Sequence, residues 1–326
     1  MRTLILGASG YIGQRLFQKL SASEWAKPAG ASRGRGNADS NAVHLRVDTR
    51  NLKALTLALK EYECVVNCVA GDFDSIANGA RTLAQAAMAA KCKRIVHLSS
   101  MAVYGRTEGN VSEQAPLDPG LGWYARAKCQ AETHMAAFAR DGGEVVVLRP
   151  GCVFGSGSQL WVGRVARWLR AGRVGDLGAA GDGWSNLVHA NDVCDAIAAA
   201  MRLPIGRGGM PVFNLAAPDS PRWNEYLVDL AIAIDATPVR RISARQLRFD
   251  SMVAGPPLKL AEKFLDKCGV RRPWLPEPLP PSVVRLWSQD IRLIALAATK
   301  VLAMRWTSYG DSLRESSDWY RLGAKQ

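Results

Sequence analysis

The sequence contains no pair of cysteines in a C-x-x-C arrangement, and its four histidines stand far apart. Such pairs and clusters are the spacings typical of metal sites, and without them we predict no metal site. The seven cysteines are odd in number and scattered along the chain. This distribution favours buried free thiols over a disulfide framework.

The sequence also lacks an apolar stretch long enough to cross a membrane. The longest stretch near the C-terminus, residues 291–304, is too short and contains Arg292 and Lys300. The opening residues, MRTLILGAS, lack the pattern of a secretory signal and pass directly into a strand-like run. We therefore expect a cytoplasmic protein without a membrane span.

Positive charge is in excess, with a formal net charge of +13. Arginines dominate and are spread over the chain, and the basic stretches lack the interleaved aromatic residues that single-stranded RNA binding uses. We therefore predict no nucleic-acid partner. In the segment GRVARWLRAGR, four arginines recur every three residues, as either a solvated helix face or an anion-binding surface. They are Arg164, Arg167, Arg170 and Arg173.

Short β-rich apolar runs alternate with amphipathic helical stretches from Met1 to Pro150. This alternation predicts right-handed β-α-β units and an α/β fold with a doubly wound parallel sheet. The expected strands are TLIL, PAGAS, AVHLRV, CVVNCVA, RIVHLSS and EVVVLR. After Pro150 the pattern loosens, and a mostly helical tail contains a proline-rich break at 271–281.

Glycines recur every three residues in GASGYIG, residues 7–13, between the first strand and the first helix. Gly7, Gly10 and Gly13 allow a tight turn and a close approach of the backbone to a diphosphate. The following helix N-terminus adds N–H groups and a positive dipole end. We predict dinucleotide binding at this loop.

The tip of the second strand distinguishes NAD from NADP. NAD-binding proteins place an acidic side chain there, about 20 residues after the glycine loop, to hold the ribose 2′-hydroxyl. This sequence has Ser32, Arg33 and Arg35 instead. Because a guanidinium group suits a 2′-phosphate, we favour NADP(H) over NAD(H). The alternative is that both arginines are solvated loop residues.

Tyr124 and Lys128 stand four residues apart in GWYARAKCQAE, so both side chains share one helix face. A free tyrosine has a pKa of about 10, and a nearby ammonium group stabilises its phenolate and fits it for proton transfer. Ser99 and Ser100, at a predicted strand end, offer a hydroxyl that polarises a substrate oxygen. The Y-x-x-x-K spacing alone is more often accidental than catalytic, but together these features favour an enzyme.

With these motifs, the sequence resembles the extended short-chain dehydrogenase/reductases of the NAD-dependent epimerase/dehydratase family. The resemblance covers nearly the whole chain in the family's order. It implies a Rossmann domain at 1–150, to which 187–215 returns, and a smaller, mostly helical substrate-binding part at 151–326. The matching segments are GASGYIG (7–13), HLSSMAVYG (97–105), YARAK (124–128), LRPGCVFG (148–155), NLVHANDVCDAI (186–197), VFNLAAP (212–218) and SLRESSDWY (312–320).

The resemblance also implies roles for individual residues. Ser100 would be the catalytic serine, Tyr124 the acid/base, and Lys128 the partner that lowers its pKa and reaches the cofactor ribose. Asp48 would lie near the adenine, and Pro150 and Val153 would border the nicotinamide. The residues implied to bind cofactor are Gly7, Ser9, Gly10, Tyr11, Ile12, Gly13, Ser32, Arg33, Arg35, Asp48, Val69, Ala70, Gly71, Lys128, Pro150 and Val153. An alternative role in the core or in turns applies to six of these residues: Asp48, Val69, Ala70, Gly71, Pro150 and Val153.

Departures from the family pattern bear on the reaction. Met101 and Ala102 follow Ser100 where dehydratases carry acids, which disfavours dehydration and leaves oxidation, reduction or epimerisation. Cys152 replaces the family's asparagine, and Ser185 or Trp184 its arginine, which weakens the sugar-diphosphate grip. We favour a sugar-derived or nucleotide-linked, anionic substrate over an apolar alcohol, ketone or polyketide-like one. Cys152 is either a buried thiol or, less simply, an acid/base.

Two functions thus compete: an NADP(H)-dependent oxidoreductase or epimerase, and a non-catalytic NADP(H)-binding regulator or RNA-associated relative. The intact serine, tyrosine and lysine favour the enzyme. The resemblance further implies a homodimer formed through the helices at 75–91 and 124–140. Apolar residues at helical spacing in 283–306 predict packing over the cleft or against a second subunit, with a membrane-surface helix as the alternative.

Overall fold

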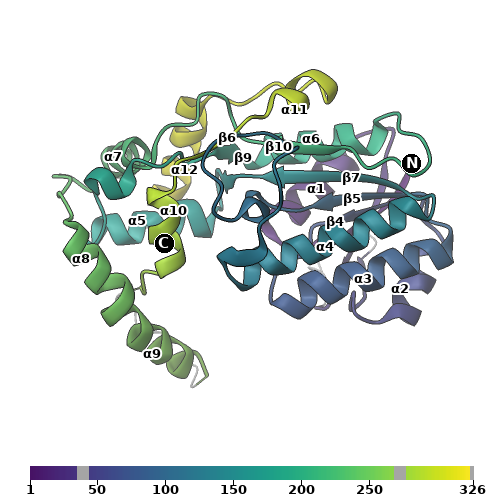
Figure 1. Cartoon of the computed structure of the whole chain (residues 1–326), viewed down its shortest axis with the longest axis horizontal. Coiled ribbons are helices and arrows are strands. Elements are labelled where there is room, and N and C mark those ends of the chain that lie inside the picture. Colours follow the sequence, from purple (N-terminus) through teal and green to yellow (C-terminus); the bar gives the residue numbers. More distant parts are fainter. Residues whose placement is uncertain (35–43, 268–276, 324–326) are drawn as a thin grey trace.

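A parallel seven-stranded sheet forms the larger part of the molecule (Figure 1). The computed structural model describes residues 1–34, 44–267 and 277–323. The strand order is β10-β7-β5-β4-β1-β2-β3, and every neighbouring pair is parallel. This confirms the predicted doubly wound α/β fold. The strands of this sheet are β1 (Arg2–Leu6), β2 (Lys27–Ser32), β3 (His44–Arg46), β4 (Cys64–Asn67), β5 (Arg94–Leu98), β7 (Glu144–Pro150) and β10 (Val212–Leu215).

Helices cover both faces of the sheet, so its strands are apolar on both sides. In β1, Leu4 and Leu6 pack on one face with α2, α3 and α4, whereas Ile5 packs on the other with α1, α6 and α11. Figure 1 shows α3 and α4 side by side below the sheet and α6 above it. These helices are α1 (Tyr11–Ser21), α2 (Leu52–Leu59), α3 (Phe73–Ala90), α4 (Trp123–Arg140), α6 (Ala190–Arg202) and α11 (Leu296–Val301).

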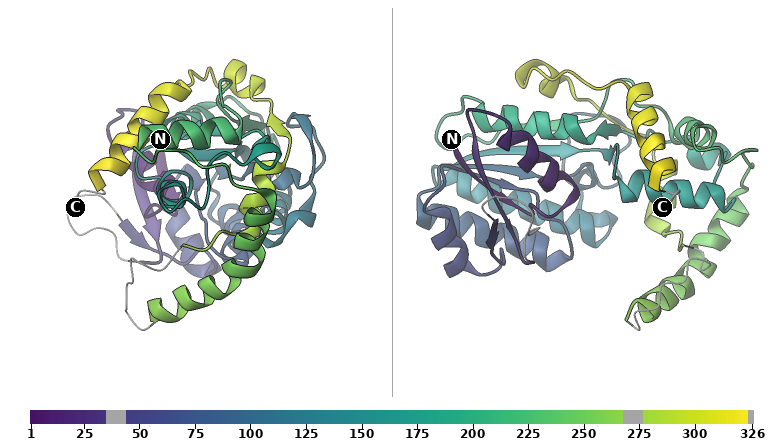
Figure 2. Two further views of the ribbon diagram at one scale, coloured as in Figure 1. Left: turned by 90° about the vertical axis from the view of Figure 1, so that its left-hand side faces the viewer. Right: turned by 180° about the vertical axis from the view of Figure 1, so that it is seen from behind.

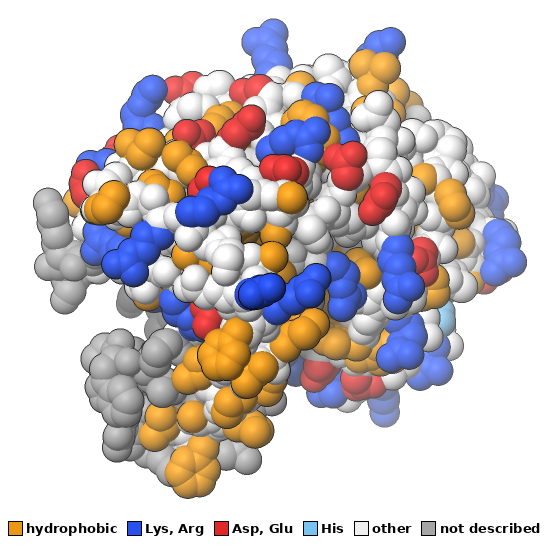
Figure 3. Space-filling view, turned by 60° about the vertical axis from the view of Figure 1, so that its left-hand side comes forward, with side chains coloured by type: hydrophobic (Ala, Val, Ile, Leu, Met, Phe, Trp, Pro, Cys, Tyr) orange, Lys and Arg blue, Asp and Glu red, His pale blue; other side chains and the backbone are white. Residues whose placement is uncertain are grey.

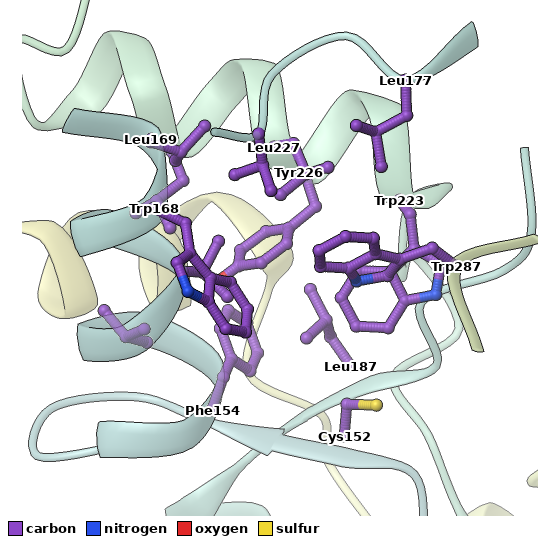
Figure 4. Packing of buried hydrophobic residues seen from close by; sticks show 14 of the residues in the cluster. Cys152, Phe154, Trp168, Leu169, Leu177, Leu187, Trp223, Tyr226, Leu227 and Trp287 are labelled. Atoms are coloured by element: carbon purple, nitrogen blue, oxygen red, sulfur yellow. The ribbon is translucent and has the colours of Figure 1, made fainter. Parts of the chain in front are cut away.

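The smaller part has its own aromatic core. Trp168, Trp223 and Trp287 are fully buried and meet edge-on or tilted, with ring centroids 6.0 and 6.4 Å apart (Figure 4). The elements of this part are β8 (Cys152–Phe154), β9 (Leu187–His189), η3 (Gln159–Gly163), α5 (Arg164–Arg170), η4 (Gly178–Gly181), α7 (Trp223–Ala233), α8 (Ala244–Arg248), η5 (Phe249–Ala254), α9 (Gly255–Lys267), α10 (Pro281–Ser288) and α12 (Tyr309–Gly323). β8 and β9 pair with each other.

The arginine repeat on and after α5 makes contacts within the chain, and two of its members, Arg167 and Arg170, are also exposed, as a solvated face predicts. Arg164 and Arg167 both pair with Glu277, at 2.6 and 2.7 Å. Arg173 pairs with Asp250 at 3.6 Å, and Arg170 donates to the carbonyl of Ile234. The repeat therefore fastens later segments of the chain to α5.

The tail at 283–306 is not one helix. It runs through α10, a short strand β11 (Ile291–Leu293) that pairs with β6 (Gly109–Val111), and α11. Trp287, Ile291 and Leu293 are buried in the aromatic core, and Leu302 packs on the face of the sheet that α1 and α6 cover. The tail thus packs against its own chain, and the helix predicted from its periodicity is broken because three residues pair as a strand.

Candidate active site

The order of the strands reverses between β1 and β4, and the loops that follow these two strands meet at the carboxyl edge of the sheet. The N–H of Cys68, after β4, donates to the carbonyl of Leu6 at 3.0 Å. A Cβ atom on Gly7 would lie 2.8 Å from the Cys68 carbonyl oxygen. Ligands of open parallel sheets bind at such a reversal. The described geometry thus brings the glycine loop to the position where a nucleotide is expected.

The glycine loop has the shape of a diphosphate cradle. Gly7 adopts a φ of 77°, in the left-handed region, and a Cβ on Gly13 would lie 2.2 Å from the Gly7 carbonyl oxygen. Gly10 caps α1 without any side-chain hydrogen bond, so its helix N-terminus is open to an anion. Ser9 is exposed in the turn and Ile12 is buried below it. These residues fit the diphosphate of a dinucleotide.

Tyr11, predicted to contact cofactor, is held in a structural contact. Its hydroxyl donates to the carbonyl of Ser156 at 3.0 Å, and the Arg15 guanidinium lies 4.2 Å from its ring centroid. Burial raises the pKa of Tyr11 to about 12. The phenol therefore ties the first helix to the segment after β8.

The tip of β2 carries no acidic side chain among its described residues, which end at Gly34. Ser32 Oγ lies 2.8 Å from His44 Nε2, and Arg33 is exposed. Arg35 lies outside the described residues. Asp48, predicted to lie near the adenine, pairs with Arg50 at 2.8 Å, and these hydrogen bonds lower its pKa to about 2.

The remaining predicted cofactor contacts follow β4, β7 and β8. Val69 donates its N–H to Asn67 Oδ1 at 3.2 Å, and Ala70 and Gly71 are exposed beyond it. Pro150 is buried at the end of β7, and Val153 in β8 is half-buried. Val69, Ala70 and Gly71 therefore follow β4 at the strand reversal, and the contact of Pro150 or Val153 with a cofactor stays a prediction.

The serine, tyrosine and lysine lie on two packed elements. α4 carries Tyr124 and Lys128 and packs against η1 (Met101–Tyr104), which Ser100 caps. The Lys128 ammonium is 5.9 Å from the Tyr124 ring centroid and donates to the carbonyl of Leu98, at the end of β5, at 2.8 Å. Tyr124 is exposed whereas Lys128 is buried. The lysine is thus fixed beneath an accessible phenol.

The structure distinguishes the two neighbouring serines. Ser99 is buried and donates to Glu132 Oε1 at 2.6 Å. Ser100 is half-buried, and its Oγ accepts a hydrogen bond from the N–H of Ala102 at 3.2 Å. Because the Ser100 oxygen acts as acceptor in this bond, its hydroxyl proton is available for a bond to a substrate.

Sequence reasoning missed a buried polar network behind this site. Arg149 binds Glu132 through two hydrogen bonds, at 2.9 and 2.6 Å, and donates to the Tyr104 hydroxyl at 2.9 Å. Tyr104 in turn donates to Asn214 Oδ1 at 2.6 Å. An arginine inside the apolar run EVVVLR was the available signal, because such a charge needs a buried partner.

Cys152 pairs with Leu187 across β8 and β9 and belongs to the aromatic core (Figure 4). It is 2% exposed, and burial raises the pKa of its thiol. Ser185 is also buried and donates to the carbonyl of Pro221 at 2.6 Å. Both positions therefore serve packing, and the acid/base alternative for Cys152 finds no support in this geometry.

Comparison with known proteins identifies the family of the chain. A sequence model of the NAD dependent epimerase/dehydratase family matches residues 3–216. The chain belongs to this family. Membership confirms the resemblance and the prediction of an enzyme of the NAD(P)-dependent oxidoreductase and epimerase class.

Individual family members are similar over most of their length. N-acetyl-alpha-D-glucosaminyl-diphospho-ditrans,octacis-undecaprenol 4-epimerase of Escherichia coli O157:H7 is 24% identical over 246 residues, covering 70% of each chain. UDP-glucose 4-epimerase of Thermotoga maritima, solved with UDP-glucose, has a TM-score of 0.74 and 18% identity, covering 99% of this chain and all of that one. MoeE5, solved with UDP-glucuronic acid and NAD, has a TM-score of 0.72 and 22% identity over the same shares. These structures share the fold.

Proposed function

We propose that this enzyme oxidises or reduces a secondary alcohol or ketone of a diphosphate-linked sugar, either as a net reaction or as the two halves of an epimerisation. The observation that supports it most is the exposed Tyr124 phenol above the buried Lys128, with Ser100 on the adjoining element. Family membership and the substrates named for its relatives support the sugar class.

Each residue has a distinct task in the proposed reaction. Tyr124 accepts the proton of the substrate hydroxyl and returns it in the reverse direction, and the Lys128 ammonium lies 5.9 Å from its ring centroid. Ser100 donates a hydrogen bond to the same substrate oxygen and fixes its position. A bound nicotinamide ring supplies hydride acceptor and donor chemistry. The glycine loop and the α1 N-terminus hold the diphosphate that connects the two halves of that cofactor.

We propose that residues 151–326 supply most of the substrate pocket. The E. coli relative acts, by its name, on a sugar linked through a diphosphate to undecaprenol, and the two solved relatives hold UDP-sugars. The common chemical element is a sugar diphosphate. Because Cys152 and Ser185 are buried in packing roles, the diphosphate grip of this chain differs from the family pattern.

Deuterium labelling tests the reaction. Purified enzyme is incubated in D₂O with UDP-sugars and with a polyprenyl-diphosphate sugar, and NMR monitors both the epimer ratio and the C–H signals. Epimerisation through hydride transfer retains hydrogen at the inverted carbon. Incorporation of deuterium there would indicate proton abstraction from carbon and would contradict the proposed use of Tyr124.

We further propose a preference for NADP(H). The support is the exposed Arg33 at the tip of β2 and the absence of an acidic side chain among the described residues of that tip. The solved relative MoeE5 holds NAD, so the preference requires a direct test. Titration should give a lower Kd for NADP⁺ than for NAD⁺, and Arg33→Ala should raise the Kd for NADP⁺ alone. Tighter binding of NAD⁺ by the native protein would remove this proposal.

A further inference from the structure

A helical arm projects from the smaller part of the molecule (Figures 1 and 2). It consists of α8, η5 and α9 in direct succession, residues 244–267. The base of the arm is anchored: Leu247 and Ser251 are buried, and a Cβ on Gly255 would lie 3.1 Å from the Leu279 carbonyl oxygen. The face of the arm that meets the body is therefore already buried by the rest of the chain.

A second apolar face of the arm is exposed. Phe249, Met252, Val253, Leu260 and Phe264 are 58, 65, 58, 70 and 68% exposed. Their spacing, together with the exposed prolines at 256 and 257, follows the three- and four-residue steps of one helix face. Figure 3 shows hydrophobic side chains covering much of the visible surface of the arm. An apolar stripe of this kind marks an interaction surface.

Basic side chains accompany the stripe. Arg245, Arg248 and Lys259 are exposed, and residues 244–267 contain five basic and three acidic residues. Further Lys and Arg side chains lie on the body next to the arm in Figure 3. The whole chain carries a net charge of +13. Two copies that met along this surface would bring like charges together, whereas an anionic surface complements them.

We propose that the arm docks on an anionic lipid bilayer. The stripe from Phe249 to Phe264 lies in the region between head groups and acyl chains, and Arg245, Arg248 and Lys259 meet lipid phosphates. Amphipathic helices with large apolar residues on one face and basic residues beside it bind membranes in this way, parallel to the surface. This proposal does not depend on the identity of the substrate. Lipid binding and enzymatic turnover are measured separately, so one proposal is able to fail without the other.

Vesicle flotation of the full chain tests the inference. The native protein should float with vesicles of phosphatidylglycerol and phosphatidylcholine in equal parts, and much less with phosphatidylcholine alone. Leu260→Glu with Phe264→Glu should lower the floated fraction by about tenfold, because two charges enter the apolar face. The matched control is Leu57→Glu, which should change nothing. Leu57 is 67% exposed and belongs to α2, a helix that Figure 1 shows on the other side of the molecule from α9.

Two results would overturn the inference: no flotation of the native protein with anionic vesicles, and equal flotation of the double variant. Sedimentation without lipid tests whether a second copy of the chain covers the stripe instead. If the native protein is a dimer and the double variant is a monomer, the stripe is a dimer interface, which would contradict docking on lipid. Limited trypsin digestion of the native chain needs no variant. Anionic vesicles should protect the bonds after Arg248 and Lys259, and unchanged cleavage would contradict docking.

Discussion

At the residue scale, the adjacent residues Ser99 and Ser100 differ in their burial and in their hydrogen bonds. Ser99 is buried and donates to Glu132, whereas Ser100 accepts a hydrogen bond from the N–H of Ala102. The sequence predicted that one of them polarises the substrate, and the resemblance selected Ser100. We propose Ser100 for this role because the Ser99 hydroxyl already donates to a buried carboxylate.

We predict opposite effects for the two alanine variants. Ser100→Ala should lower kcat by about 100-fold, as loss of a donor to a reacting oxygen does, with little change in Tm. Ser99→Ala should lower the unfolding free energy by about 1 kcal/mol, since it removes one buried hydrogen bond, and leave kcat closer to native. Steady-state kinetics and thermal unfolding of both variants check this. The reverse pattern would assign the catalytic role to Ser99.

At the scale of elements, most of the sheet could be predicted from the sequence. β1, β4 and β7 are apolar on both faces, and this leaves continuous runs such as EVVVLR in the chain. The glycine loop and the Tyr124/Lys128 pair are local in sequence, so the sequence alone was enough to propose them. The Glu132–Arg149 pair joins a helix to a strand, and no local pattern encodes which charges meet.

The arm shows that helical periodicity does not predict which face of a helix is buried. An apolar stripe at helical spacing is typical of a core-facing helix, and α9 has such a stripe on its exposed side. Periodicity gives the faces of a helix but not what covers them. Likewise, the spacing in 283–306 predicted one helix, whereas pairing of β11 with β6 overrides that spacing.

The buried pair between α4 and β7 should be costly to break. Glu132→Gln leaves the Arg149 charge, which is 5% exposed, without its carboxylate, and should lower the unfolding free energy by about 3–5 kcal/mol. The matched control is Glu61→Gln, whose partner Arg2 is 51% exposed and which should cost less than about 1 kcal/mol. Urea unfolding at pH 7 measures both. Equal costs would contradict the assigned role of the network.

His97, near the end of β5, should make the free energy of unfolding depend on pH. Burial, and then the Lys128 charge, lower the pKa of His97 to about 3. The unfolded chain therefore binds one more proton than the folded one between pH 3 and about 6.5, and stability falls as pH falls through this window. His97→Gln should make the unfolding free energy less steep there, by about 1 kcal/mol per pH unit. Parallel pH profiles for the native and variant proteins would contradict this.

At the scale of the whole molecule, we propose different roles for the two parts. The larger part contributes the glycine loop, Ser100, Tyr124 and Lys128 from the carboxyl edge of one sheet. The smaller part, with its aromatic core and arm, is proposed to bind substrate and to dock on lipid. Among the residues that the structure describes, no helix combines the length and apolarity needed to cross a bilayer.

We propose that the whole molecule is a homodimer formed through the outer faces of α3 and α4, which pack together within the chain. Met88 is exposed on α3, at 39%. Met88→Glu should shift the mass measured by light scattering from dimer to monomer, because a carboxylate would enter the interface. Leu57→Glu on α2 should leave the dimer intact. A native monomer would remove this proposal.

The central claim is that Tyr124 transfers the proton in a reaction whose cofactor binds at the glycine loop. The most direct measurement compares kcat and the cofactor Kd for native enzyme and Tyr124→Phe, which removes a single oxygen from an exposed side chain. We predict that kcat falls by about 100- to 10,000-fold while the cofactor Kd stays within a few-fold of native. An unchanged kcat in the variant would contradict the account.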